Sequence, residues 1–168
     1  MNSIRINKVS LNIGVGDSGE KLQKAERLLR ELTGQKPVRT YGKKTISEWN
    51  VKKFAPIGVK VTLRGENAKK FLERAFVAVE NIVRQEQFDS QGNLSFGVKE
   101  YIELPGAKYD PDVGMFGFDV NVNLDRMGYR IARRKYAKRK IPSKLRISQE
   151  EAKKFFEENF KVKVQSEA

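Results

Sequence analysis

The 168-residue chain contains no cysteine and no histidine. Their absence excludes disulfide frameworks, Cys- or His-ligated zinc sites and nucleophile–histidine pairs of the Ser-His-Asp kind. Asp110 and Asp112 flank a proline, but aspartates in that setting commonly form turns. We therefore predict no catalytic residue, no metal site and no cofactor, and a protein that is not an enzyme.

Long apolar runs are also missing from the chain. No segment approaches the roughly 18 consecutive apolar residues of a membrane span, and residues 1–5 form no apolar signal region. A basic helix with bulky apolar anchors, which a membrane-surface protein needs, is not evident either. The sequence thus predicts a protein without a membrane partner.

Positive charge is what the chain has in excess, with 34 lysines and arginines against 21 acids and a formal net charge of +13. Residues 36–64 hold eight basic residues and one acid, and residues 126–146 hold ten basic residues and no acid. Residues 85–125, by contrast, hold two basic and eight acidic residues. A long tract without carboxylates repels itself unless a polyanion neutralises it, so a nucleic acid is the indicated partner.

Alternating and helical apolar patterns predict the secondary structure. Strands are expected at residues 4–15, 57–63, 98–104, 116–124 and 161–164, with a bulge near residues 7–8 in the first. Helices are expected from a cap at Asp17 to Gly34, at residues 68–83, and from a Ser148–Glu151 capping box onward, burying Ala152, Phe155 and Phe156. Residues 35–56 and 87–97 are expected to be loops, and 126–147 are ambiguous between helix and extended chain.

Each predicted strand is apolar on one face only, which indicates an α+β fold. We expect a largely antiparallel sheet with helices packed on one face, as a two-layer sandwich, and an open polar face on the other side. No repeat or linker divides the chain, so residues 1–168 are interpreted as a single domain. Within it, residues 126–147 form a basic segment, and residues 148–164 form a C-terminal helix plus strand.

The open face is the first candidate site. Ser10, Asn12, Lys60, Thr62 and Arg64 alternate with apolar residues in two predicted strands. Their amide, hydroxyl and cationic groups can donate hydrogen bonds to phosphates and 2′-hydroxyls of RNA. An ordinary solvated sheet face is the alternative interpretation.

A glycine motif offers a competing class of function. Gly14, Gly16 and Gly19 form a G-x-G-x-x-G pattern between a strand and a helix, which is typical of dinucleotide-binding enzymes. However, Asp17 would place a carboxylate against the pyrophosphate, and no second strand–helix–strand unit follows. A tight turn in which glycine permits close backbone approach is the simpler interpretation.

Several segments, in order along most of the chain, resemble one family: the universal large-subunit ribosomal protein number five, which binds 5S ribosomal RNA, in its archaeal form. The matching segments are NKVSLNIGVG (7–16), TGQKP (33–37), KKTI (43–46), PIGVKVTLRG (56–65), SFGVKE (95–100) and DVGMFGFD (112–119). Compared with bacterial members, the sequence begins almost at its first strand, without their N-terminal helix. Residues 126–147 resemble archaeal and eukaryotic members instead.

The resemblance implies an α+β sandwich that is a structural constituent of the large ribosomal subunit. It implies hydrogen bonds to 5S rRNA from Asn12, Gln35 and Thr62, with Lys36, Lys60 and Arg64 nearby. It also implies that the loop matching residues 41–50 reaches the peptidyl-site transfer RNA, through Lys43, Lys44, Thr45, Ile46 and Ser47. Trp49 lies in that loop, although burial in a core is the usual role of a lone tryptophan.

The implied partners are those of a cytoplasmic ribosome: 5S rRNA, large-subunit rRNA, peptidyl-site tRNA, neighbouring ribosomal proteins of the central protuberance, and a small-subunit head protein across an intersubunit bridge. The role of the basic segment is an inference from its charge. We expect it to make further rRNA contacts, instead of contacts with a neighbouring protein, through Arg130, Arg133, Arg134, Lys138 and Arg139.

Overall fold

The structure is a computed structural model that describes residues 3–165. Its centre is a five-stranded sheet in the order β2-β3-β1-β6-β5, in which every neighbouring pair is antiparallel. The strands are β1 (Ile4–Gly14), β2 (Val38–Tyr41), β3 (Pro56–Leu63), β5 (Leu94–Val98) and β6 (Phe118–Arg126). The predicted antiparallel sheet is confirmed.

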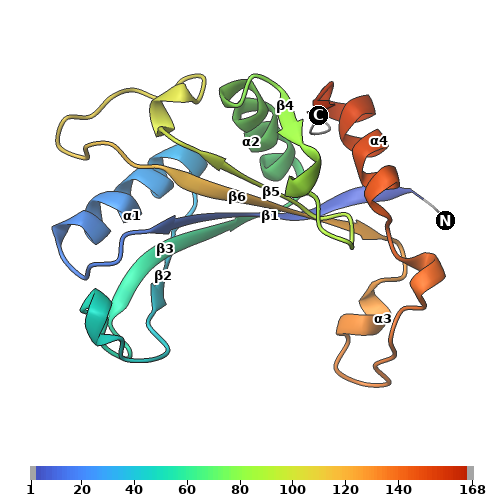
Figure 1. Cartoon of the computed structure of the whole chain (residues 1–168), viewed down its shortest axis with the longest axis horizontal. Helices are drawn as coiled ribbons and strands as arrows, with labels where there is room; N and C mark the ends of the chain where they lie inside the picture. Colours follow the sequence, from blue (N-terminus) through green and yellow to red (C-terminus); the bar gives the residue numbers. More distant parts are fainter. Residues whose placement is uncertain (1–2, 166–168) are drawn as a thin grey trace.

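Three helices cover one face of this sheet, as Figure 1 shows. They are α1 (Glu20–Thr33), α2 (Gly65–Ala78) and α4 (Gln149–Phe160), and beside them β4 (Ile82–Arg84) and β7 (Lys163–Gln165) form a small parallel sheet. This arrangement confirms the two-layer α+β class. Within residues 3–165, no helix is long and apolar enough to cross a membrane.

The core lies between the helices and the sheet. Val9, Leu11 and Ile13 of β1 are at most 1% exposed, whereas Ser10 and Asn12 between them are half-buried on the other face. Burial of one face per strand is what the alternation predicted. The predicted bulge is confirmed between Ile6 and Lys8, and it allows the isoleucines of opposite parity in β1 to pack against the core.

The glycine motif forms a turn against a neighbouring strand. The backbone N–H groups of Val15 and Gly16 both donate to the Ile57 carbonyl, at 3.0 and 2.9 Å. β1 lies between β3 and β6 and is antiparallel to both, so the parallel neighbour that a dinucleotide-binding unit needs is missing beside it. The nucleotide-enzyme alternative is therefore wrong.

The predicted cap of the first helix is also wrong. The N-cap of α1 is Gly19, and no side chain caps the helix there. The carboxylate of Asp17 instead accepts the neighbouring Ser18 backbone N–H at 2.7 Å. The capping box of α4 is confirmed: Ser148 Oγ accepts the Glu151 N–H, and the Glu151 carboxylate accepts the Ser148 N–H.

Three other boundaries differ from the prediction. α2 ends at Ala78, not near Val83, because Glu80 and Asn81 adopt left-handed backbone conformations and the chain turns into β4. The expected loop at 35–56 contains the edge strand β2, and the expected strand at 98–104 begins earlier, as β5, and ends at Val98. Phe155 of α4 is half-buried, whereas Ala152 and Phe156 are buried.

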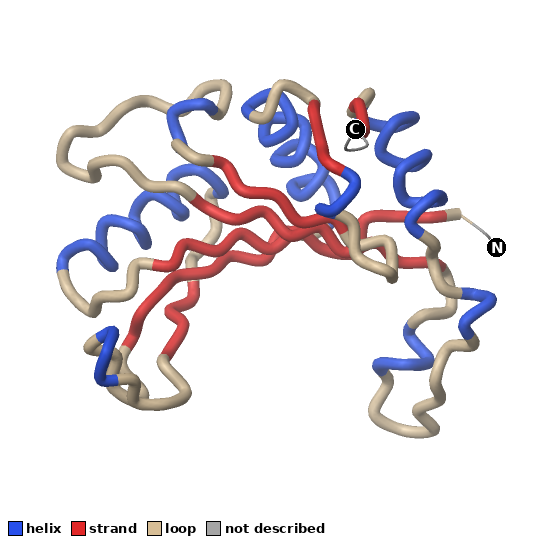
Figure 2. The backbone as a smooth tube through the Cα atoms, viewed as in Figure 1, coloured by secondary structure: helices blue, strands red, loops and turns tan. Residues whose placement is uncertain are grey.

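Two loop-rich segments project from the side of the sheet opposite the helices (Figure 2). The 42–55 loop connects β2 to β3 and contains the short 3-10 helix η1 (Ser47–Trp49). The basic arm, residues 127–147, connects β6 to α4 and contains α3 (Arg130–Arg133) and η4 (Ser143–Leu145). The uncovered sheet face lies between these two projections, and we call it the open face.

Candidate nucleic-acid interface

The polar side chains of the open face form a regular array, which we call the strand lattice. The register of the strands decides which of these side chains are neighbours. Asn12 of β1 pairs with Lys60 of β3 on one side and with Asp119 of β6 on the other. Two residues along β1, and on the same face, Ser10 lies between Thr62 and Asn121. Since neighbouring strands are about 4.8 Å apart, these polar groups form two adjacent rows across the sheet.

A third row consists of linked amides at the end of the open face nearest the basic arm. Asn7 Nδ2 donates to Asn123 Oδ1, and Asn123 Nδ2 donates to Asn93 Oδ1, both at 2.8 Å. The Arg64 guanidinium approaches the side-chain oxygen of Asn7 at 3.3 Å. Arg64 is therefore oriented along the face by β1, although it lies at the N-cap of α2.

Charge is unevenly distributed over the open face. Lys60 and Arg64 are exposed at its β3 side, whereas Asp119 is exposed on β6. Asp119 was not among the site residues predicted from the sequence. The alternation of residues 116–124 already assigns it to the polar side of its strand, but only the register places it next to Asn12. A carboxylate on such a face accepts hydrogen bonds from base N–H or 2′-OH groups and repels phosphates.

Gln35 and Lys36 lie at the β2 edge of the sheet. Gly34 ends α1 in the left-handed conformation with φ 67°, and its N–H donates to Arg30 O at 2.8 Å. The chain then enters β2, whose first residue, Val38, is paired with Lys60. Gln35 and Lys36 thus directly precede an edge strand that the sequence did not predict and that pairs with the strand carrying Lys60 and Thr62.

The 42–55 loop is held by its own hydrogen bonds. Ile46 and Val51 exchange two backbone hydrogen bonds, at 2.8 and 3.1 Å, and Thr45 Oγ1 accepts the Lys53 N–H at 3.1 Å. Lys43, Lys44 and Ser47 are exposed and Ile46 is half-buried. The loop therefore presents four exposed lysines, Lys43, Lys44, Lys52 and Lys53, on a defined backbone.

Two aromatic side chains are exposed on the same loop. Trp49 is 70% and Phe54 is 72% exposed, so Trp49 does not take the usual buried role. Phe54 has φ 66°, a strained conformation for a residue with a side chain, and its N–H donates to Gly42 O at 2.8 Å. Exposed aromatic rings beside lysines can stack on unpaired bases.

The basic arm uses part of its charge internally. Arg133 pairs with the buried Asp125, and the Arg134 guanidinium donates twice to Ala137 O, at 2.9 and 2.7 Å. The expected contact residues Arg130, Lys138 and Arg139 are exposed. The structure therefore divides the five predicted arm residues into two that stabilise the arm and three whose side chains extend into solvent.

The joint between the arm and α4 contains a perturbed carboxyl group. The pKa of Glu151 is lowered, first by the Ser148 backbone N–H that it accepts and then by Arg126, which lies 2.6 Å away. Tyr129 Oη donates to Leu145 O at 2.8 Å, and Ile147 is 1% exposed within the core. The Tyr129–Leu145 bond ties the two ends of the arm together, and Ile147 anchors the arm in the core.

The fold and the open face define a class: a basic two-layer α+β protein with an uncovered polar sheet face, suited to nucleic acid. Comparison with known proteins identifies the family. The family described as "Ribosomal protein L5" matches residues 1–52, and the C-terminus of the same ribosomal family matches residues 56–155. The chain belongs to the ribosomal protein L5 family.

Individual relatives agree with this assignment, and all bear the name large ribosomal subunit protein uL5. The relative from Sulfurisphaera tokodaii is 51% identical over 98% of this chain and 93% of its own length. Those from Methanoculleus marisnigri and Methanobrevibacter smithii are 49% and 48% identical, over 98% and 96% of this chain and 98% and 95% of their own lengths. The predicted archaeal type is confirmed, and so is the prediction that the chain is not an enzyme, since the family is a structural one.

Proposed function

We propose that this protein is a structural constituent of the large ribosomal subunit that binds 5S rRNA through the open face. It helps to form the central protuberance and contacts peptidyl-site tRNA through the 42–55 loop. The single observation that carries the 5S proposal is the strand register, which places Asn12, Thr62 and Lys60 side by side on a face without a helical cover. The name of the relatives supports the ribosomal assignment.

The geometry of the face suits a folded RNA. Amide and hydroxyl groups at fixed strand spacing can bond riboses and base edges, while Lys60 and Arg64 neutralise phosphates. Gln35 and Lys36 extend the donor set at the β2 edge. Exposed cations of the basic arm, led by Arg130, Lys138 and Arg139, are then available to large-subunit rRNA.

Two substitutions on the open face test the 5S proposal. Asn12→Ala and Thr62→Ala should each weaken 5S rRNA binding by about 1–3 kcal/mol, because each leaves an RNA group without its partner. Gel shift or fluorescence titration at several salt concentrations measures this loss. Gln23→Ala, at an exposed amide on α1, is the matched control and should not change the affinity.

The 5S proposal has two ways to fail. If the unaltered protein bound arbitrary RNA of the same length as tightly as 5S rRNA, the specific interpretation would be lost. If both open-face variants kept full affinity, the binding site would have to lie elsewhere on the surface.

The tRNA proposal is tested separately with the 42–55 loop. Replacing Lys43 and Lys44 together by Ala should leave 5S binding within about twofold, because these lysines lie outside the strand lattice. Peptidyl-site tRNA binding to ribosomes reconstituted with this variant should fall. The control replaces the consecutive lysines Lys69 and Lys70, which are exposed on α2 on the helical side. An equal loss in the 5S and tRNA assays would show that the loop is not a separate site.

The remaining partners follow from the same assignment. Neighbouring proteins of the central protuberance and a small-subunit head protein across an intersubunit bridge are proposed to contact surfaces away from the open face. The acidic stretch between the two basic regions, which includes Glu100, Glu103 and Asp112, is exposed and is suited to basic protein partners.

A further inference from the structure

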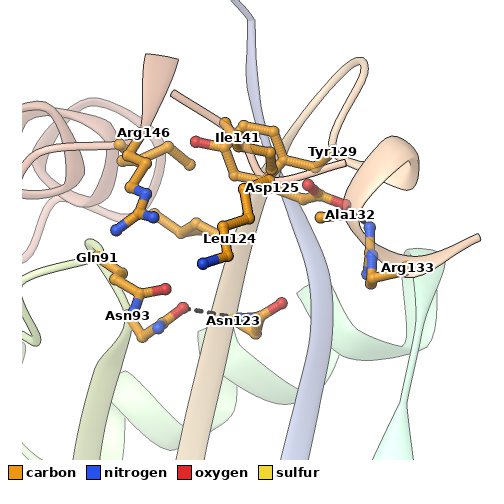
Figure 3. A pocket seen from close by; sticks show the side chains of 12 residues that line it. Gln91, Asn93, Asn123, Leu124, Asp125, Tyr129, Ala132, Arg133, Ile141 and Arg146 are labelled. Carbon is orange, nitrogen blue, oxygen red and sulfur yellow. Dashed lines mark hydrogen bonds and ion pairs between the residues drawn. The ribbon is translucent and has the colours of Figure 1, made fainter. Parts of the chain in front are cut away.

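A pocket of about 310 Å³ lies where the basic arm crosses the end of the open face. Its volume is at the lower end of the roughly 300–1,000 Å³ range of small-ligand sites. That size suits one nucleotide and excludes a duplex. Figure 3 shows the pocket between β6 and the arm. Twelve residues line it, and they come from the loop before β5, from β6 and from the basic arm.

The walls of the pocket differ in chemistry. In Figure 3, the amides of Gln91, Asn93 and Asn123 lie along one side, and Tyr129 and Ile141 lie along the other. The Asn93 and Asn123 amides are bonded to each other and to neighbouring groups. The amide side therefore offers the Gln91 amide and the remaining hydrogen-bonding positions of these two, and the other side offers an aromatic ring and an aliphatic side chain. A planar, polar-edged group such as a nucleobase matches both sides, because bases stack on their faces and hydrogen-bond on their edges.

Cations surround this corner of the molecule. Arg133, Lys140 and Arg146 all line the pocket and are all exposed. The one lining carboxylate, that of Asp125, is paired with Arg133. The local charge is therefore positive after pairing, which favours a ligand with a phosphate.

Asp125 adds a buried carboxylate to this corner of the molecule. It is 2% exposed at the end of β6, and its Oδ1 is buried without a hydrogen-bond partner in the part of the chain that the structure describes. An unsatisfied buried acceptor is unfavourable, so natural proteins seldom retain one without a reason. Because this Oδ1 has almost no accessible surface, a ligand in the pocket would reach it only after the wall rearranges locally.

We propose that this corner pocket receives one unstacked nucleotide of ribosomal RNA. The base lies between the amide side and the Tyr129 side, and its phosphate lies against Lys140 and Arg146. The inference rests on the proposed rRNA-binding function but concerns a site separate from the Asn12–Thr62 lattice. An acidic protein segment is the competing ligand. The side-chain amides on one side of the pocket and the ring of Tyr129 on the other favour a base.

The pocket exists before RNA arrives, because the arm is braced by its own hydrogen bonds and anchored in the core. Tyr129 Oη donates to Leu145 O, and Arg139 N–H donates to Ile131 O at 3.3 Å. Ile147, also a lining residue, is buried in the core. A preformed site loses less conformational entropy on binding than a disordered arm would.

The test uses the full chain and the four nucleoside 5′-monophosphates as probes. NMR shifts of the Asn93 and Asn123 side-chain amides and of the Ala132 methyl group follow binding at low salt. We expect saturable shifts with a dissociation constant on the order of 1 mM for at least one nucleotide. Ribose 5-phosphate, which has the phosphate but no base, should bind about fivefold or more weakly.

Matched variants locate the site. Ala132→Phe fills the pocket without changing charge and should weaken nucleotide binding about tenfold or more. Ile131→Phe, at the adjacent exposed position outside the pocket lining, should change it less than about twofold. If Ala132→Phe does not fold, Lys140→Gln and Arg146→Gln replace it and should weaken nucleotide binding severalfold.

Several results would overturn the inference: no saturable shifts, ribose 5-phosphate binding as tightly as nucleotides, or unchanged binding by the pocket variants. Tighter binding of a short oligoglutamate peptide than of any nucleotide would assign the pocket to a protein partner instead. Failure of 5S binding with intact nucleotide binding would contradict the proposed function and leave the pocket standing. Intact 5S binding in Ala132→Phe, with nucleotide binding lost, would establish the two sites as separate.

Discussion

Both basic regions of this protein use some of their arginines internally, but they bond them to different parts of the chain. In residues 36–64, Lys43, Lys44 and Lys60 are exposed, and Arg39 is paired across to Glu26 of α1. In the basic arm, by contrast, Arg133 and Arg134 are bonded to other groups of the chain, as is Arg126 at its root. Each segment therefore offers RNA fewer free cations than its composition indicates. The net charge of a segment indicates the class of its partner, whereas its exposed and unpaired cations indicate where that partner makes contact.

The two regions also differ in how they are supported. The first includes strands β2 and β3, whose backbone hydrogen bonds fix Lys60 within the sheet. The arm has only two short helical turns, and it depends on side-chain anchors at its ends, chiefly Tyr129 and Ile147. A single substitution can therefore loosen the arm, whereas the strand lattice shares its stability with the whole sheet.

The largest expected effect is on the arm anchor. Ile147→Ala should lower the free energy of unfolding by about 2–4 kcal/mol, since it leaves a cavity in the core. It should also raise hydrogen exchange across residues 127–147 more than in β3. Leu145→Ala is the control, because Leu145 is 55% exposed and its loss should cost less than about 0.5 kcal/mol. Equal exchange in both regions of Ile147→Ala would show that the arm does not depend on this anchor.

A smaller effect separates free from engaged cations. Lys60→Gln should weaken 5S rRNA binding and reduce the slope of log affinity against log salt by about 1, as expected for one lost phosphate contact. Arg134→Gln should reduce the slope less, because the Arg134 guanidinium is held by Ala137 O. Titrations at four or more salt concentrations measure both slopes. Identical slopes for the two variants would show that bonding to Ala137 O does not keep Arg134 from RNA.

The smallest effect concerns acid sensitivity at the joint between the arm and α4. Because the pKa of Glu151 is lower in the folded state, its contribution to stability is present above the unfolded pKa and is lost as pH falls through the folded pKa. Thermal unfolding followed from about pH 7 to about pH 3 should show a smaller acid-induced decrease in Glu151→Gln than in the unaltered protein. The variant should start from a lower melting temperature near neutral pH. Parallel curves for the two proteins would remove Glu151 from the acid response.

Period-two patterns predicted the central strands because burial of one sheet face imposes that period. They did not predict β2, since Val38 and Tyr41 are both more than half exposed at the sheet edge and show no alternation of burial. β5 does alternate, but it was not predicted because its surroundings are typical of a loop. The residues before it are polar and include Gly92, and Gly97 lies within it. The second helix was predicted to be too long, because apolar residues at helical spacing continue past Ala78. Those at positions 82 and 83 belong to β4.

The candidate site was predictable only in part. Alternation assigned Asn12 and Thr62 to the polar side, and the resemblance added Gln35 and Lys36. The neighbours of each residue depended on register, which joins strands far apart in the chain. Asp119 was therefore missed, as was the division of the arm's arginines between internal bonds and solvent.

The sequence by itself determined which residues alternate, where positive charge is concentrated and which family the segments resemble, because each of these is a local or compositional property. Only the tertiary structure decided which polar groups meet, as when Asn7 bonds Asn123 across 116 positions. It also decided that the arm folds over Asp125 and forms a pocket there. Such pairings arise when distant strands share one core, so no local pattern of residues encodes them.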